Sequence, residues 1–151
     1  MISQTIEYSL RAMVHLASLA PGASANSETI AKHTKVPQGY LSKVLRDLVV
    51  AGLILSQRGP NGGFSLARSS EQISMLDVVN AVDPMKRIRR CPLGNPAHVK
   101  LCPLHHRIDN AMDMVEREFG ATSLAEVIAS GSEVIGCKGL ISPTIRRKPA
   151  S

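Results

Sequence analysis

No uninterrupted apolar run in this 151-residue sequence approaches the length that crosses a bilayer, and the N-terminus lacks the basic-then-apolar pattern of a secretion signal. We therefore expect a cytoplasmic protein without a membrane partner. Cysteine is also scarce, and its three residues are an odd number. In a reducing compartment they do not indicate a disulfide framework, so metal binding or redox chemistry is the better explanation for them.

Common catalytic motifs are missing as well. The sequence contains no glycine-rich phosphate loop, no C-x-x-C, no H-E-x-x-H and no G-x-S-x-G. We therefore do not expect an enzyme, and a metal or thiol enzyme on the same scaffold is kept as an alternative. Acidic residues number 12 against 18 lysines and arginines, which gives a formal net charge of +6. This charge predicts a polyanionic partner, and nucleic acid fits better than a membrane because no long basic amphipathic helix with bulky apolar anchors is visible.

Residues 36–68 predict a helix, a sharp stop and a tight hairpin. Apolar side chains recur at spacings of three and four between residues 40 and 49, which is the pattern of one buried helical face. Pro37 suits the first turn because it has no N–H to leave unpaired, and Gly52 suits the position just past the helix. The opposite face is small, polar and basic, with Gly39, Ser42, Lys43 and Arg46.

The hairpin is predicted from two short segments, residues 53–57 and 64–68, joined by a turn that contains Asn61-Gly62. Asn-Gly tolerates the positive φ angles that hairpin turns require. A polar-faced helix followed by a basic-edged hairpin is the outline of a winged helix-turn-helix that binds double-stranded DNA. The expected DNA contacts are Gln38, Gly39, Tyr40, Ser42, Lys43, Arg46, Arg58 and Asn61.

Two alternatives stay open for this surface. The lysines and arginines could simply be solvated on a helix that packs against a hairpin. The surface could also bind a protein, although a protein-binding face would more often expose aromatic anchors.

The flanking segments predict further helices. The first covers residues 2–20, and its residues Glu7, Arg11 and His15 recur every four positions as a solvated face. Others are expected over residues 26–34, 74–82, 104–120 and 123–130, from their apolar spacing and capping residues. We interpret the apolar stripe of residues 104–119 as a dimer seam, because a winged helix needs a two-fold partner to read a palindrome; intrachain core is the alternative.

Candidate metal ligands gather between residues 85 and 106, mostly in a stretch without periodic pattern. They are Cys91, His98, Cys102, His105 and His106. Thiolates and imidazoles suit zinc or an iron-sulfur cluster. Four cations at positions 86, 87, 89 and 90 are expected to favour thiolate over thiol. The alternative is a pair of unremarkable buried thiols near solvated histidines. Cys137 has no neighbouring ligand and is expected to be free.

The run P-x-x-Y-L-x-x-x-L-x-x-L-x-x-A-G-L-x-x-S-x-R-G-x-x-G-G-[FY]-x-L-A, which begins at Pro37, resembles the winged-helix segment of the Rrf-type (IscR/NsrR-like) family of bacterial transcription regulators. The resemblance extends more loosely over residues 2–128. It implies a homodimer that binds a roughly palindromic operator.

Cluster-binding members of this family carry three cysteines in the loop, and some use a histidine three residues after the last one. Cys91, Cys102 and His105 match the first cysteine, the last cysteine and that histidine. The middle cysteine is missing, and His98 is the nearest ligating residue. Other members complete a 2Fe-2S cluster with an acidic residue from the first helix of the other subunit, where Glu7 stands here. The histidine that such a site can take from the same helix falls on Arg11, which cannot ligate.

The predicted fold is mainly α with a small β-hairpin, a winged helix-turn-helix plus a long C-terminal dimerisation helix. The predicted parts are a DNA-binding domain (1–83), a Cys/His sensor loop (84–103), a dimerisation helix with a following short helix (104–130) and a flexible basic tail (131–151). The predicted function is transcription regulation by a DNA-binding homodimer that senses redox state, nitric oxide or iron-sulfur status through the cluster. The alternative keeps the DNA binding but uses a thiol switch, zinc or a small-molecule effector.

Overall fold

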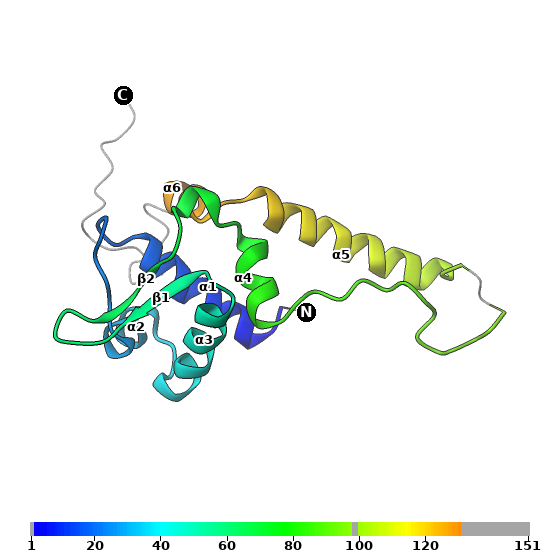
Figure 1. Cartoon of the computed structure of the whole chain (residues 1–151). Coiled ribbons are helices and arrows are strands. Elements are labelled where there is room, and N and C mark those ends of the chain that lie inside the picture. Colours follow the sequence, from blue (N-terminus) through cyan, green and yellow to red (C-terminus); the bar gives the residue numbers. More distant parts are fainter. Residues whose placement is uncertain (1, 98–99, 131–151) are drawn as a thin grey trace, which may run out of the picture.

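The computed structural model describes residues 2–97 and 100–130, and within them a compact helical body and one projecting helix (Figure 1). The body consists of five helices, a 3-10 turn and a hairpin, and α5 extends away from it. The elements are α1 (Gln4–Ala17), α2 (Ser27–Thr34), α3 (Gln38–Val50), β1 (Ile54–Gln57), β2 (Gly63–Leu66), η1 (Ser70–Gln72), α4 (Met75–Val82), α5 (Pro103–Ala121) and α6 (Leu124–Ser130). This confirms the prediction of a mainly helical winged helix-turn-helix.

The core lies where α1, α2, α3 and α4 meet the hairpin. Its fully buried side chains include Met13, Ile30, Leu41, Leu45, Leu48, Ile54 and Val78. These residues come from α1, α2, α3, β1 and α4, so the hydrophobic effect that stabilises the fold also fixes α3 against α1 and β1.

The helix ends follow their capping residues. The Ser3 side chain accepts from the Ile6 amide, so α1 begins at Gln4, and the Asn26 side chain caps α2 in the same way. Ser74 and Asp77 form a capping box at the start of α4. Between α2 and α3, Lys35 adopts the left-handed conformation at φ 56, which gives the tight turn into α3.

The hairpin is antiparallel, with Ile54 paired to Leu66 and Gln57 to Gly63. The expectation for its turn was wrong in one respect: the positive φ angles lie at Gly59 and Gly63, and not at Asn61-Gly62. The reason at Gly63 is a close approach, since a β-carbon there would lie 2.7 Å from the carbonyl of Ala25. Ala25 pairs with Phe64 through two backbone hydrogen bonds of 2.8 and 3.0 Å, which ties β2 to the segment before α2.

The stripe of Glu7, Arg11 and His15 also departs from expectation. Glu7 is exposed and pairs with Arg11 at 3.0 Å, as a solvated stripe would. His15, in contrast, is buried, with 2% of its surface exposed. Four residues turn a helix by about 40° more than one full turn, so the third member of the stripe has rotated from the surface into the core.

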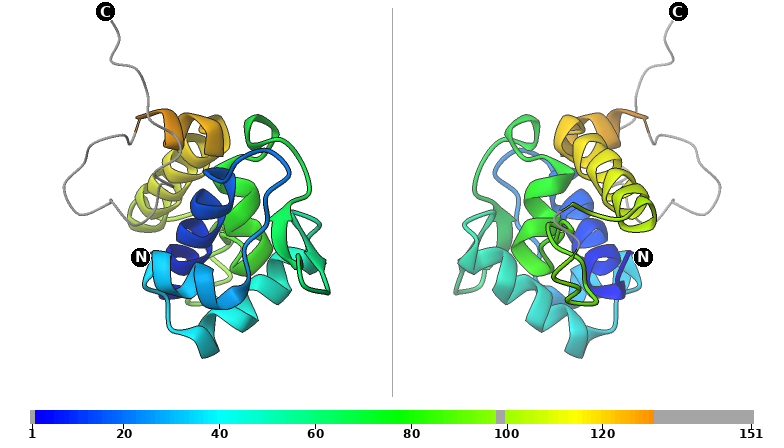
Figure 2. Two further views of the ribbon diagram at one scale, coloured as in Figure 1. Left: turned by 90° about the vertical axis from the view of Figure 1, so that its left-hand side faces the viewer. Right: turned by 90° about the vertical axis from the view of Figure 1, so that its right-hand side faces the viewer.

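The C-terminal helices differ in their packing. None of the 19 residues of α5 is buried in this chain, and its described neighbours are α4 and the segment that precedes it. The shorter α6 returns to the body, where Leu124 and Ile128 are buried and the helix packs on α1 (Figure 2). The short helix expected after the dimerisation helix thus contributes to the core of the winged-helix body in this chain.

No helix in the part of the chain that the structure describes is both long enough and apolar enough to span a bilayer.

Candidate DNA-binding surface and sensor segment

The outer face of α3 carries the side chains expected to contact DNA. Leu41, Val44 and Leu45 point into the core, and the residues on the opposite face of the helix are exposed. On α3 the exposed members of the predicted set are Gln38, Gly39, Tyr40, Ser42, Lys43 and Arg46. Their donors can reach base edges and phosphate oxygens if α3 lies in a major groove.

Tyr40 has a different environment from the rest of the set. Its hydroxyl lies 2.6 Å from the Thr5 hydroxyl, and its ring meets that of Tyr8 edge to face with centroids 5.2 Å apart. These contacts fasten the start of α3 to α1. Tyr40 therefore positions α3 in the structure, although its ring remains partly exposed.

The wing presents Arg58 and Asn61 to solvent beyond the hairpin strands. The Asn61 carbonyl accepts from the Ser24 hydroxyl at 3.3 Å, which holds the wing tip to the loop before α2. A hollow between α2, α3 and the hairpin is lined by Ser27, Ser42, Leu45, Arg46, Val49, Val50, Ser56 and Phe64. Ser27 and Ser56 were not predicted from the sequence; with Ser42 and Arg46 they offer donors for a phosphate backbone. The only sequence signal for Ser27 was its position at the start of α2.

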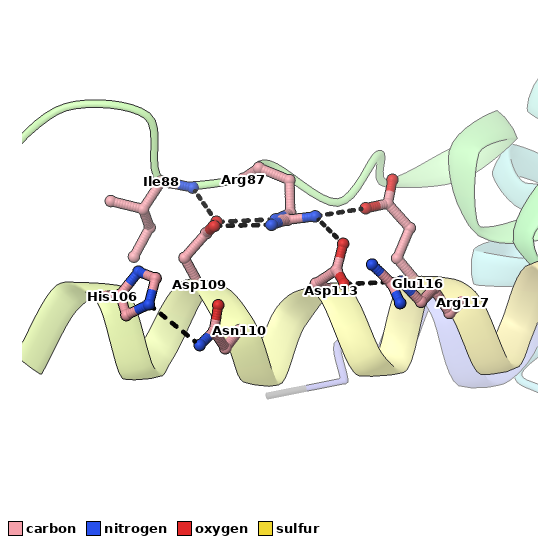
Figure 3. A network of polar contacts seen from close by, with 8 residues as sticks. All are labelled: Arg87, Ile88, His106, Asp109, Asn110, Asp113, Glu116 and Arg117. Atoms are coloured by element: carbon pink, nitrogen blue, oxygen red, sulfur yellow. Dashed lines mark hydrogen bonds and ion pairs between the residues drawn. The ribbon is translucent and has the colours of Figure 1, made fainter. Parts of the chain in front are cut away.

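The described residues between α4 and α5, 83–97 and 100–102, form no helix or strand, and the first part of this segment runs beside α5 (Figure 1). Arg87 holds it there. Its Nε and Nη2 atoms each donate to one oxygen of Asp109 at 2.7 Å, and Nη1 donates to Asp113 and, at 3.4 Å, to Glu116 (Figure 3). The Ile88 amide adds a hydrogen bond of 2.9 Å to Asp109.

The cluster of Arg87 with three α5 carboxylates shifts the pKa values of its own members. The hydrogen bonds from Arg87 lower the pKa of Asp109 to about 2, against the opposing effect of burial. The same bonds raise the pKa of Arg87. Of the four cations expected to favour thiolate, Arg87 is thus neutralised by carboxylates, whereas Lys86, Arg89 and Arg90 stay exposed.

Cys102 and His105 are the two candidate ligands that the structure brings together. Cys102 is the N-cap of α5, and its Sγ lies 3.2 Å from the Nδ1 of His105, one helical turn later. Pro103 occupies the first helical position, where its missing N–H is not needed. Both side chains are partly buried.

The remaining candidates lie apart from this pair. Cys91 is partly buried in the loop, where its carbonyl accepts from the Gly94 amide at 3.1 Å. Glu7 is engaged by Arg11 on α1. His98 and Cys137 fall outside the described residues. Within residues 2–97 and 100–130, no three His, Cys, Asp or Glu side chains are arranged to hold a metal ion. The soft donor pair therefore fits two coordination positions of a metal or cluster, and the other positions need a rearranged loop or a second chain.

Comparisons with known proteins show which family the chain resembles. The family model Rrf2, described as iron-dependent transcriptional regulator, matches residues 2–130. An HTH-type transcriptional regulator of Aquifex aeolicus is 30% identical over 135 residues, covering 83% of this chain and 90% of that protein.

Two solved structures share the fold. CymR, the global cysteine regulator of B. subtilis, superposes with a TM-score of 0.72 at 23% identity, over 86% of this chain and 97% of CymR. IscR of T. potens superposes with a TM-score of 0.72 at 21% identity, over 86% of this chain and 87% of IscR. At these identities the likeness concerns the fold alone.

Proposed function

The chain belongs to the Rrf2 family of DNA-binding transcriptional regulators, which are not enzymes, and from this we propose that it acts as a homodimer whose Cys/His segment controls operator binding through an iron-sulfur cluster. The observation that carries the proposal is the Cys102–His105 pair, which sits at the start of the helix that joins the sensor segment to the winged-helix body.

Operator reading follows from the exposed face of α3 and the wing. Lys43 and Arg46 would contact phosphates or base edges from the major groove, and Arg58 would reach a minor groove or a phosphate. A roughly palindromic operator requires two such bodies related by a two-fold axis.

The face of α5 supplies a surface for that two-fold contact. Leu104 and Ile108, one turn apart on the same face, are 64% and 42% exposed, on a helix with no buried residue. Exposed apolar area costs about 25 cal/mol per Å², so a second copy of α5 would remove an unfavourable surface from water. At about 1.5 Å per residue this helix is roughly 28 Å long, so two copies of α5 could pack along several helical turns.

For the cluster, Cys91, Cys102 and His105 would be the ligands from one chain, completed by His98 or by Glu7 of the other chain. An iron-sulfur group would supply sensitivity to oxidants, nitric oxide or iron supply. The Glu7 alternative requires its ion pair with Arg11 to open. Such exposed pairs contribute little stability, so opening it is inexpensive.

Arg87 offers a route from the ligands to α5. The sensor segment is bound to α5 by the Arg87 and Ile88 hydrogen bonds, and Asp109 lies one helical turn beyond His105. A change of ligation at Cys102 and His105 would therefore act on the same stretch of α5. A second candidate function keeps this route but uses the thiols directly, as a redox switch without a cluster.

The test is the metal content of protein purified without oxygen. We expect iron and acid-labile sulfide in matching amounts, with visible absorption. Cys102→Ser and His105→Ala should lose most of this signal while remaining dimeric by light scattering, and Cys137→Ser is the matched control that should keep it. A wild type that stays colourless after anaerobic reconstitution, or a Cys102→Ser variant with full iron and sulfide, would rule out the cluster as proposed.

A further inference from the structure

A buried and an exposed histidine stack where α1 meets α2, far along the chain from the sensor segment. His15 on α1 is 2% exposed, and neither of its ring nitrogens has a hydrogen-bond partner. Its ring stacks on that of His33 on α2, with centroids 5.0 Å apart and planes 20° from parallel. His33 is exposed, and its Nδ1 lies 2.8 Å from the Thr29 carbonyl oxygen.

A buried imidazole without partners is tolerable only while it is neutral. Protonated, His15 would carry a charge and two N–H donors in a site that offers no acceptor to either. Burial lowers the pKa of His15, and the neighbouring His33 lowers it further.

No carboxylate on the elements packed against α1 compensates for such a charge. Asp77 and Glu126 bind the amides of their own helix caps on α4 and α6, and β2 carries no titratable residue. On α1 itself, Glu7 is paired with Arg11. The other titratable residues of α2 and α3 are Glu28, Lys32, Tyr40, Lys43, Arg46 and Asp47, and none of them hydrogen-bonds His15.

The stacked pair lies where the DNA-reading helix is positioned. His33 is in the last turn of α2, followed by buried Thr34 and by Lys35, which makes the left-handed turn into α3. Arg11 adds a hydrogen bond of 3.4 Å from α1 to the Thr34 carbonyl. The contact of α1 with the end of α2 thus sets where α3 leaves the core.

We propose that the His15–His33 stack is a pH-sensitive element of the DNA-binding body, in which protonation of His15 separates α1 from α2 and weakens DNA binding on mild acidification. This inference is independent of the cluster. It needs only the winged helix-turn-helix and its DNA binding.

Proton linkage determines in which direction stability changes with pH. An unfolded histidine titrates near 6.5, and the folded His15 has a lower pKa, so the unfolded state takes up the proton first. The stability from the neutral stack is full above about pH 6.5 and is lost as the pH falls below it. Within that window the unfolding constant rises by up to roughly tenfold per pH unit, until the folded pKa is reached.

The experiment uses the full chain and measures urea unfolding and DNA affinity at about pH 7.5, 6.5 and 5.5, with NMR titration of the histidine rings. For wild type we expect His15 to titrate below the unfolded value near 6.5, unfolding to become easier by up to about fivefold between pH 6.5 and 5.5, and DNA affinity to fall. His15→Phe, which keeps a stackable ring, should remove most of this dependence. His106→Gln, at an exposed site on α5, should keep it.

A second variant covers the case in which His15→Phe does not fold. His33→Phe at the exposed partner keeps the stack but removes one imidazole, and should raise the pH at which His15 titrates. Wild-type stability that is constant over this range, a normal titration of His15, or full pH dependence in His15→Phe would overturn the proposal. A change in stability with constant DNA affinity would overturn its link to DNA.

Discussion

Arg58→Ala and Lys43→Ala each lower the affinity for the operator by roughly 5- to 150-fold, which corresponds to about 1–3 kcal/mol per lost base contact. Arg58 stands exposed on the wing and Lys43 on the outer face of α3, so neither substitution disturbs the core. Fluorescence anisotropy with labelled operator DNA measures the loss. Substituting a residue that contacts only phosphate should also lower the salt dependence of DNA affinity by about one released counterion.

The matched controls for these two variants are Arg89→Ala and Lys86→Ala. They remove the same charges from exposed positions in the sensor segment, which is part of neither α3 nor the wing. We expect them to leave the affinity nearly unchanged. Equal losses in both pairs would mean that only the overall positive charge matters, and would remove the assigned reading surface.

Arg87→Ala is expected to release the sensor segment from α5 and to abolish the response of DNA binding to the effector. Without Arg87, the carboxylates of Asp109, Asp113 and Glu116 face one another on α5 with no shared cation. Arg117→Ala is the control, because Arg117 also pairs with Asp113, at 2.7 Å, but is 81% exposed. We expect a clear fall in thermal stability for Arg87→Ala and almost none for Arg117→Ala.

The pH dependence of the stability lost in Arg87→Ala shows whether the loss comes from the ion pair with Asp109. Asp109 has a folded pKa of about 2, below its usual value near 3.8, so its contribution is complete above about pH 4 and is lost as the pH falls towards 2. The stability gap between wild type and Arg87→Ala should therefore shrink over that range. A constant gap, or an intact effector response in Arg87→Ala, would contradict the role given to this cluster.

Local pattern was sufficient to predict α3 and the hairpin. The three-and-four spacing of Leu41, Val44 and Leu48 identified the buried face, and the exposed basic face followed from it. The turn was harder, because the need for glycine at Gly63 depends on the approach of Ala25, which lies far away in sequence. His15 was expected to be solvated, but it is buried, because residues four apart drift around a helix. Its burial depends on how α2 packs against the end of α1, which the local pattern does not show.

The sensor site was only partly predictable from the sequence, because some of its contacts join residues that are far apart along the chain. Cys102 and His105 are three residues apart on one helix start, so their proximity follows from local geometry. The Arg87 cluster joins residues 22 to 29 positions apart. Its sequence signals were a basic run and carboxylates at 109, 113 and 116 on one helical face, but neither says which arginine is used.

The most direct test of the account is operator affinity, measured in two states of the sensor segment. The operator is first selected from random-sequence DNA by protein purified without oxygen, and binding is then measured before and after treatment with nitric oxide or an iron chelator. We predict a change of at least about fivefold for wild type, the lower end of ordinary allosteric coupling, and no change for Cys102→Ser. Equal affinity in all states of the wild-type protein would contradict the claim that its Cys/His segment controls DNA binding.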